Sequence, residues 1–274
     1  MFQVSAYSKK SIQQQQSINM RGFIPPQNSE ETVFVKKSAH ILEMADGLGR
    51  VQYTLFMDLR QQQLFKAQAN KYPCISVEFL CGYNGDYERC IAAVYPDNED
   101  ISYYTPPIVV LKTDINDDTV SHKDFLGAAM GLKIKRDYIG DIILDNNHAY
   151  IVCHKNVADI LIEELHGVKR SSVSFEYYDR SLTFTRKYSE IKTATVASLR
   201  ADSVVAALLN KSRTEAVKHI KQGNVKINHM DVSQTDFEIF DNDIISVKYN
   251  GKFKVFCDGS KSRKDRIFIN IAKY

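Results

Sequence analysis

The chain has 274 residues, enough for two domains or three small ones. Hydrophobic residues make up 44% and charged residues 25% of the sequence, proportions that are ordinary for a globular protein, and the net charge is only +3. No apolar run approaches the roughly 18–20 residues that a membrane-spanning helix needs, so the sequence predicts no span of this kind.

The five cysteines, Cys74, Cys81, Cys90, Cys153 and Cys257, form no C-x-x-C pair. An odd number at irregular spacing, with no secretory signal, indicates reduced thiols in a cytosolic compartment. A zinc site built from Cys74, Cys81 and Cys90 is the alternative, but their spacing matches no familiar metal motif. Buried or incidental thiols are the preferred interpretation, and neither a metal nor a cofactor is expected.

Residues 1–29 contain a glutamine run, several serines and the Pro25-Pro26 pair, and no acidic residue precedes Glu30. The preferred interpretation is a disordered leader, or a start codon assigned too early with Met20 as the true start. An organelle transit peptide is also poor in acids and rich in serine, but this segment lacks the several arginines and the amphipathic face of one. We therefore expect a cytoplasmic protein, with organelle import as the alternative.

Two helices are predicted near the start of the folded part. The first covers residues 30–46, where apolar residues recur at helical spacing. The second begins at Asp58, which can form a capping box with Gln61, and runs to about Asn70. Its polar face, residues 60–63, is interpreted as solvated surface.

Strands are predicted next, over residues 75–80 and 91–95. The turn between them gathers Tyr83, Tyr87 and Arg89. These side chains could stack on nucleic-acid bases, but packing against the sheet is the preferred interpretation.

The segment from residue 108 to residue 178 predicts the order β-α-β-β-α-β. The strands are expected at 108–112, 141–144, 149–153 and 172–177, and the helices at 121–131 and 156–166. This order is that of the ferredoxin-like plait, which places both helices on one face of a four-stranded sheet. Many RNA-binding modules use this fold, but so do enzymes and regulatory domains, so the fold alone does not decide function.

The strands of this plait lack the aromatic signature of an RNA-recognition motif. Lys133, Lys135 and Arg136 follow its first helix and are the candidate contacts to RNA phosphates. A merely solvated loop is the alternative interpretation of these three cations.

The basic residues are concentrated toward the C-terminus. Residues 200–274 hold 14 Lys and Arg against 9 Asp and Glu, while the rest of the chain holds 22 against 24. Such an asymmetry is typical of a nucleic-acid-binding module. Residues 181–197 are interpreted as a linker with one extended piece, and residues 258–274 as a basic tail with a terminal strand.

The stretch 200–228 predicts two short helices joined by a capped turn. Ser212 and Glu215 can form a capping box, and Gly223 lies where the second helix needs a positive φ to end. Thr214, Lys218 and Lys221 recur at i, i+4 and i+7, so they share one exposed face. A compact helix pair with a basic face suits RNA better than small-molecule chemistry. Strands over 243–248 and 253–257 follow, with Asn250-Gly251 as their hairpin turn.

These C-terminal residues resemble the RNA-binding domain named after ribosomal protein S-four, also called the alpha-L motif. The resemblance rests on Leu199-Arg200-x-Asp202, Leu209-x-Lys-Ser212-Arg213, Ile220-x-x-Gly223-x-Val225-x-Ile-Asn228 and Asp243-x-Ile-Ser-Val. Asn242 stands where that family places a glycine before the distal aspartate. Because asparagine tolerates a left-handed backbone, we expect the turn to survive.

The chain from about residue 30 onward resembles the YlmH-like family of bacterial RNA-binding proteins. The motifs that carry the resemblance are Met57-Asp58-Leu-Arg60-Gln61-Gln62, Gly82-Tyr83 with Glu88-Arg89, Ala93-x-Tyr95-Pro96 and, above all, the segment from His122 to Ile142. The resemblance implies a plait-like RNA-binding domain and a C-terminal S-four-type domain. It also implies a role on the ribosome, because members are linked to large subunits that carry stalled peptidyl-tRNA and often to cell-division gene clusters.

The predicted fold class is α+β, with a small N-terminal domain, a central plait and a C-terminal alpha-L domain. The expected parts are a leader (1–29), an N-terminal helical or mixed domain (30–73), the plait (74–180), a linker (181–197), the S-four-type domain (198–257) and the basic tail (258–274). The expected partners are ribosomal RNA or tRNA and the large ribosomal subunit, and the N-terminal domain could dock a protein.

A non-catalytic RNA-binding protein is the preferred function, and an RNA-modifying enzyme of the pseudouridine synthase or methyltransferase type is the alternative. The sequence has no glycine-rich cofactor turn after a strand and no P-loop, and it lacks the Arg-Leu-Asp signature of the synthases, so no catalytic residue is expected.

The residues expected to contact RNA are Arg200, Lys211, Ser212, Arg213, Thr214, Lys218, Lys221, Lys261, Arg263, Lys264 and Arg266, together with Lys133, Lys135 and Arg136 of the plait. Structural roles are expected for Glu215, Gly223, Asn228 and Asp202. Asp202 should cap the first helix or hold Arg200 or Arg213 in place.

Overall fold

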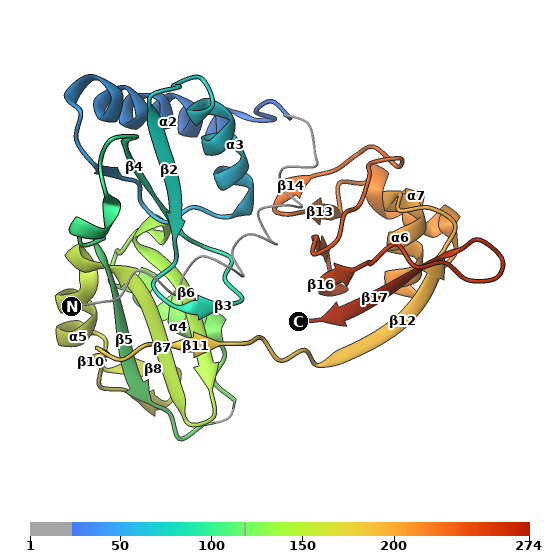
Figure 1. Cartoon of the computed structure of the whole chain (residues 1–274). Helices are drawn as coiled ribbons and strands as arrows, with labels where there is room; N and C mark the ends of the chain where they lie inside the picture. Colours follow the sequence, from blue (N-terminus) through green and yellow to red (C-terminus); the bar gives the residue numbers. More distant parts are fainter. Residues whose placement is uncertain (1–23, 118) are drawn as a thin grey trace. The chain divides into compact units, whose positions relative to one another are not determined.

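The computed structural model describes residues 24–117 and 119–274 (Figure 1). They form two compact units, residues 24–185 and Arg186–Tyr274, and both mix helices with strands in an α+β fold. No helix in these ranges is long and apolar enough to cross a bilayer. The interpretations of residues 1–23, including Met20 as the start and the transit peptide, lie outside the described residues.

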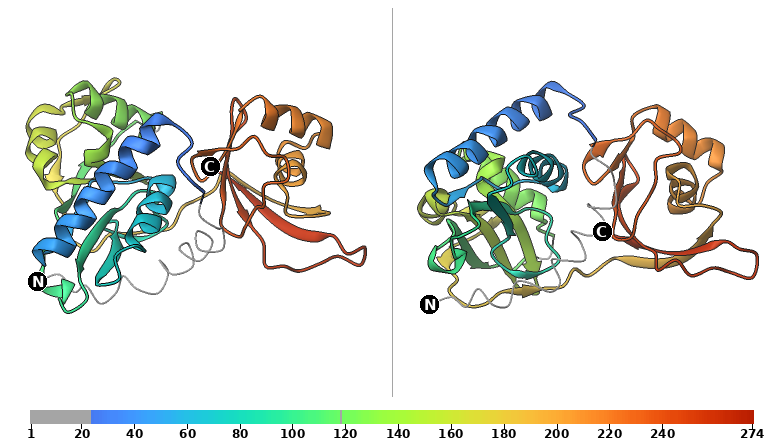
Figure 2. Two further views of the ribbon diagram at one scale, coloured as in Figure 1. Left: turned by 90° about the horizontal axis from the view of Figure 1, so that it is seen from above. Right: turned by 45° about the horizontal axis from the view of Figure 1, so that its top comes forward.

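The first unit begins with two helices that cover one face of an antiparallel sheet (Figure 2). The helices are α2 (Ser29–Leu48) and α3 (Leu59–Ala69), and the sheet has the order β1 (Gln52–Tyr53), β4 (Ile91–Pro96), β2 (Ile75–Leu80). Both predicted helices are present. Asn28, which was assigned to the leader, caps α2, and Asp58 and Gln61 form the expected capping box of α3.

The prediction of a solvated polar face on α3 is wrong for Arg60 and Gln62, whereas Gln61 and Gln63 are partly exposed. Arg60 is buried because its guanidinium has a full set of acceptors: the Glu31 carboxylate at 2.8 Å and the carbonyl oxygens of Ile24 and Pro25. Gln62 is buried as well, and its amide donates to two backbone carbonyls. Residues 24–28 are therefore tied to α3, so the predicted disordered leader extends too far toward the C-terminus.

The plait follows, and its predicted order is confirmed. Its elements are β5 (Ile108–Asp114), α4 (His122–Gly131), β6 (Ile139–Asp145), β7 (His148–His154), α5 (Ala158–Glu164) and β10 (Glu176–Tyr177), with the short 3-10 turns η3 (Arg136–Tyr138) and η4 (Lys155–Val157). The sheet order is β10-β5-β7-β6, and every pair is antiparallel. The last strand is shorter than predicted, because Ser171–Ser172 (β9) pairs with Gly167–Val168 (β8) instead of joining this sheet.

Both faces of the plait sheet are covered. On one face Leu111 and Ile151 pack against the helices α4 and α5. On the other face Val110 and Val152 pack against Phe56 and the β2–β4 sheet. Strands β2 and β4 thus belong to the N-terminal layer, and the predicted domain boundary between residues 73 and 74 is wrong.

Buried polar groups fix the joint between these two layers. The Asp141 carboxylate accepts hydrogen bonds from the Tyr83 hydroxyl at 2.8 Å and from the Glu88 amide at 2.9 Å. Burial, together with the charge of Glu88, raises the pKa of Asp141. Arg89 donates to the Phe56 carbonyl at 2.7 Å. The tyrosines of the turn, Tyr83 and Tyr87, are buried in this joint, which confirms packing as their role.

The second unit is a six-stranded antiparallel sheet with two helices packed on it (Figure 1). Its elements are β12 (Glu190–Val196), α6 (Ala201–Leu209), α7 (Arg213–Lys221), β13 (Val225–Ile227), β14 (Met230–Asp231), β15 (Ile244–Val247), β16 (Gly251–Phe256) and β17 (Ile267–Lys273), and the strand order is β12-β17-β16-β15-β13-β14.

The extended piece predicted in the linker and the predicted terminal strand are both present, as β12 and β17, but both belong to the sheet of the second unit. β12 pairs with β17 along its whole length, from Glu190 to Val196. β17 in turn pairs with β16, so the C-terminal strand lies in the interior of the sheet. The alternation of Ile267, Ile269 and Ile271 explains this, because a strand with apolar residues on one face is stabilised by a sheet partner on each side. Earlier in the segment, β11 (Thr183–Phe184) pairs with β3 (Asn84–Gly85) inside the first unit.

Replacing Gly140 with alanine should lower the free energy of unfolding by about 1–3 kcal/mol, the usual cost of overpacking. An added Cβ would lie 2.7 Å from the Phe56 ring, inside the joint between the two layers. Gly127→Ala is the matched control: it lies within α4 with no atom within 4 Å of an added Cβ. It should stabilise the protein by about 0.5–1 kcal/mol. Urea unfolding followed by circular dichroism measures the free energy of unfolding of both variants. Equal changes in the two variants would show that the contact between the two layers is loosely packed at Gly140.

Candidate nucleic-acid interface

The turn between α6 and α7 is held rigidly at both helix ends. Asn210 ends α6 in the left-handed conformation, with φ of 52°. Ser212 and Glu215 form the capping box of α7: the Glu215 amide donates to Ser212 Oγ at 3.2 Å, and the Ser212 amide donates to Glu215 Oε2 at 3.1 Å. Gly223, with φ of 70°, follows the C-terminal end of α7. The predicted helix pair is thus present, and its second helix has a fixed starting point.

A buried carboxylate connects the two helices. Asp202, in the first turn of α6, accepts hydrogen bonds on Oδ2 from Arg213 Nε at 3.0 Å and from Arg213 Nη2 at 2.8 Å. Arg200 Nε lies 3.5 Å from the other carboxylate oxygen. Burial raises the pKa of Asp202, but the hydrogen bonds from Arg213 and Arg200 outweigh burial and leave this pKa below its ordinary value. Asp202 therefore holds Arg213, one of the roles considered for it.

The exposed face of α7 carries a row of polar and basic side chains. Thr214, Lys218 and Lys221 are all exposed. Neither lysine forms an ion pair with any residue that the structure describes. Lys211 differs, because its ammonium lies 3.6 Å from the Glu215 carboxylate in an exposed pair. The row presents two unneutralised charges one helical turn apart on a rigid surface.

A second buried network positions the strands under α7. Asn228 is buried in the left-handed conformation with φ of 49°, and its amide nitrogen donates to Asp243 Oδ1 at 2.7 Å. Its amide oxygen accepts from the Ile244 backbone at 2.9 Å. Asn242, the departure from the S-four-type pattern, has φ of 66° as expected. These contacts join β13 to β15.

Residues 258–266, expected in a tail, lie in the connection between β16 and β17. Lys261 lies 2.8 Å from Asp265, and Arg266 donates to the carbonyl and hydroxyl oxygens of Thr195. Arg263 and Lys264 are exposed, and within the described ranges neither has an ion-pair partner. Two of the four predicted cations of this segment are thus engaged within the fold.

The three predicted cations of the plait fall into two groups. Lys133 and Lys135 are exposed in the turn after α4, Lys133 with φ of 63°. Arg136 is half-buried and donates to the carbonyl oxygens of Ile139 and Gly140. Burial, with the nearby charge of Arg89, lowers the pKa of Arg136 to about 10. Its guanidinium therefore supports the backbone of β6, and a contact from Arg136 to RNA stays a prediction.

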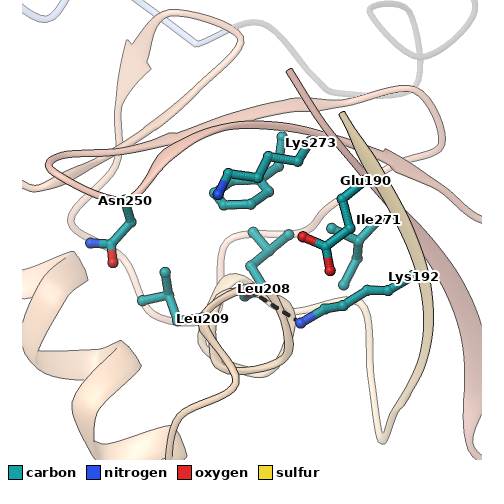
Figure 3. Close-up of a pocket in the computed structure, with 8 residues that line it drawn as sticks. Glu190, Lys192, Leu208, Leu209, Asn250, Ile271 and Lys273 are labelled. Atoms are coloured by element: carbon teal, nitrogen blue, oxygen red, sulfur yellow. Dashed lines mark hydrogen bonds between the residues drawn. The ribbon is translucent and has the colours of Figure 1, made fainter. Parts of the chain in front are cut away.

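A pocket of about 190 Å³ lies at the end of α6 (Figure 3). Lys192 reaches across it and donates to the Leu208 carbonyl at 3.4 Å, which satisfies the helix end. Its lining consists of Glu190, Lys192, Leu208, Leu209, Asn250, Phe253, Ile271 and Lys273. None of the residues predicted to contact RNA lines this pocket.

The described residues contain no group of three His, Cys, Asp or Glu side chains that could hold a metal ion. All five cysteines are unpaired. Burial raises the pKa of Cys81 and of Cys153 to about 12, so these thiols stay protonated at neutral pH.

Sequence reasoning missed one exposed aromatic side chain, Tyr249. Asn250-Gly251 was predicted as the turn of the β15–β16 hairpin, but the turn lies over residues 248–250. Tyr249, not Asn250, takes the left-handed backbone, with φ of 66°, and its side chain is 92% exposed. An aromatic residue between a lysine and an Asn-Gly pair was the signal that could have revealed it.

The Asp202–Arg213 pair should have a coupling free energy of about 1–2 kcal/mol in a double-mutant cycle of alanine substitutions measured by urea unfolding. The value stays below that of a fully buried pair because the Arg213 side chain is 55% exposed. The matched control is Lys226–Asp231, exposed on both sides, for which less than about 0.5 kcal/mol is expected. Equal coupling in the two pairs would contradict the claim that the buried Asp202 carboxylate holds Arg213 in place, the contact called the Asp202 brace below.

The coupling free energy between Asp202 and Arg213 should also depend on pH. The pKa of Asp202 is depressed in the folded protein, so its contribution should be complete above about pH 4, the ordinary range of an aspartate. The coupling should be lost as the pH falls through the depressed pKa. A coupling that stays at full size after the Asp202 carboxylate is protonated would mean that the charge of Asp202 is not its source.

Comparison with known proteins finds similarity to RNA-binding and ribosome-associated proteins. The family model described as "Putative RNA-binding domain in YlmH" matches residues 108–181, the span of the plait. The chain is 27% identical over 245 residues to "Ribosome-associated protein quality control protein P2" of Bacillus subtilis (strain 168), and the match covers 86% of this chain and 93% of that protein. The solved structure of "Cell division protein ylmH from Streptococcus pneumoniae" is similar at 20% identity with a TM-score of 0.47, and the match covers 57% of this chain and 96% of that one. The family-model match and the Bacillus subtilis relative support a relation of this chain to the YlmH-like family of RNA-binding proteins.

Proposed function

We propose that this protein is a non-catalytic RNA-binding protein that associates with ribosomal RNA or tRNA on the large ribosomal subunit. Its role would lie in the rescue or quality control of stalled translation. The Bacillus subtilis relative is named as a ribosome-associated quality control protein, and the similarity extends over both units of this chain. The match to the RNA-binding domain in YlmH supports RNA as the ligand.

The observation that carries the proposal is the row of Lys218 and Lys221 on α7. Both ammonium groups are exposed and without an ion-pair partner in the described part of the chain, and the capping box and the Asp202 brace fix the helix beneath them. A structured RNA presents phosphates at fixed positions, and a rigid helix can match them without losing much conformational entropy. Charge and shape suffice for this task, so no catalytic group is required.

Other cations would extend this contact. Lys211, Arg213, Arg263 and Lys264 are exposed in the same unit, and Arg213 reaches the surface while bound to Asp202. In the plait, both sheet faces are covered, so the sheet cannot bind bases as an RNA-recognition motif does. A second contact would instead use Lys133 and Lys135 after α4.

The double substitution Lys218→Ala and Lys221→Ala should weaken binding to purified large ribosomal subunits by several-fold to about a hundredfold at physiological salt. Each lost phosphate contact should also make the dependence of log K on log salt shallower by about 0.7–0.9. Cosedimentation over a series of salt concentrations measures both quantities. The fold should be unaffected, because both side chains point to solvent.

Lys36→Ala with Lys37→Ala removes the same charge from the exposed surface of α2 and serves as the control. This control variant should bind large ribosomal subunits with the same salt dependence as the unmodified protein. If the α7 variant binds like the unmodified protein while remaining folded, the proposed interface is wrong. If RNA incubated with the purified protein and a methyl donor acquires a modified nucleotide, the alternative of an RNA-modifying enzyme is supported instead.

A further inference from the structure

Tyr249 stands out among the aromatic side chains of the C-terminal unit. It occupies the tip of the β15–β16 hairpin and is 92% exposed, so its ring contributes nothing to the core. Aromatic rings are normally buried because they remove a large apolar area from water. Folding of this unit therefore does not explain why an aromatic residue occupies this position.

The backbone at Tyr249 is also unfavourable for this residue type. Its φ of 66° lies in the left-handed region, which glycine and asparagine adopt readily and a bulky side chain does not. Asn250 and Gly251 follow directly, so the chain holds two residues better suited to this conformation. A strained, exposed aromatic residue is a feature of binding sites rather than of turns in general.

The hairpin tip is fixed next to the end of α7. The Lys248 amide donates to the Asn224 carbonyl at 2.8 Å, and Asn224 follows Gly223 at the C-terminal end of that helix. The Asn250 amide closes the turn by donating to the Val247 carbonyl at 2.9 Å. These hydrogen bonds place the Tyr249 turn beside the helix that carries Lys218 and Lys221.

Lys248 adds a charge to the ring. Its ammonium lies 5.1 Å from the centroid of the Tyr249 ring, within the range of a cation–π contact. A ring beside an ammonium matches the two parts of a nucleotide, because the ring can stack on the base while the ammonium contacts the phosphate. An acidic or apolar partner would match only one of the two.

We propose that Tyr249 stacks on an unpaired base of the RNA that α7 binds, with Lys248 contacting the adjoining phosphate. This inference rests on the proposed function and specifies its ligand. Paired bases in an RNA helix are stacked on each other and hide their faces. The ligand is therefore a loop, bulge or single-stranded nucleotide next to the phosphates on α7.

An RNA hairpin with 2-aminopurine in its loop tests the stacking, because the fluorescence of this base is quenched when it stacks. The full chain should quench it. Tyr249→Phe should retain the quenching, whereas Tyr249→Asn and Tyr249→Ala should lose it and bind the hairpin about 5-fold to 100-fold more weakly, the effect of losing one stacked base. The salt dependence should stay unchanged in these variants, because stacking releases no counterions.

Two controls separate stacking from other effects. Tyr103→Ala removes another highly exposed tyrosine, 86% exposed in the first unit, and should change nothing. A fully paired RNA duplex without a loop should bind unmodified protein and Tyr249→Ala alike. Tyr249→Asn should fold at least as stably as the unmodified protein, because asparagine suits the left-handed backbone.

Equal binding and quenching by Tyr249→Ala and the unmodified protein would overturn the stacking proposal, as would an equal loss of affinity for hairpin and duplex. If Lys218→Ala with Lys221→Ala still weakens binding in that case, the proposed RNA function stands without Tyr249. If the unmodified protein binds neither hairpin nor duplex at low salt, both proposals are contradicted.

Discussion

The interaction between Asp202 and Arg213 determines the geometry of the candidate interface. Without it, α6 and α7 would be joined only by a short turn and by apolar packing. The buried carboxylate fixes the side chain at the start of α7, and the capping box fixes the backbone at the same point. Because both constraints act on the first turn, the direction of α7 is set before its basic row begins. The exposed lysines therefore project from a rigid support, which lowers the entropy lost on binding RNA.

The plait provides a contrast, because here burial rules out one mode of RNA binding. The sheet packs its helices on one face and the N-terminal layer on the other, and Asp141, Tyr83 and Arg89 satisfy the polar groups of that joint. Motifs that carried the family resemblance in this region, such as Gly82-Tyr83 and Glu88-Arg89, have structural roles there. The candidate surface of the first unit is left to the turn after α4.

The sequence predicted local features well where the signal is local. The capping boxes at Asp58 and Ser212, the order of the plait and the left-handed Asn242 all follow from neighbouring residues. What could not be predicted depends on tertiary partners. Arg60 was assigned to solvent because nothing in its helix shows that Glu31 and two distant carbonyls would neutralise it. β12 was assigned to a linker because its partner strand lies more than seventy residues later in the chain. In the candidate site, the charges on α7 were identified from spacing, whereas the engagement of Arg136 and Arg266 with backbone carbonyls was not.

Ultraviolet crosslinking in living cells, with identification of both the bound RNA and the crosslinked peptides, tests the central claim most directly. The account predicts RNA of the large ribosomal subunit or tRNA, attached to peptides from α7 and from the turn at residues 248–250. Crosslinks confined to other surfaces, or to messenger RNA alone, would contradict it.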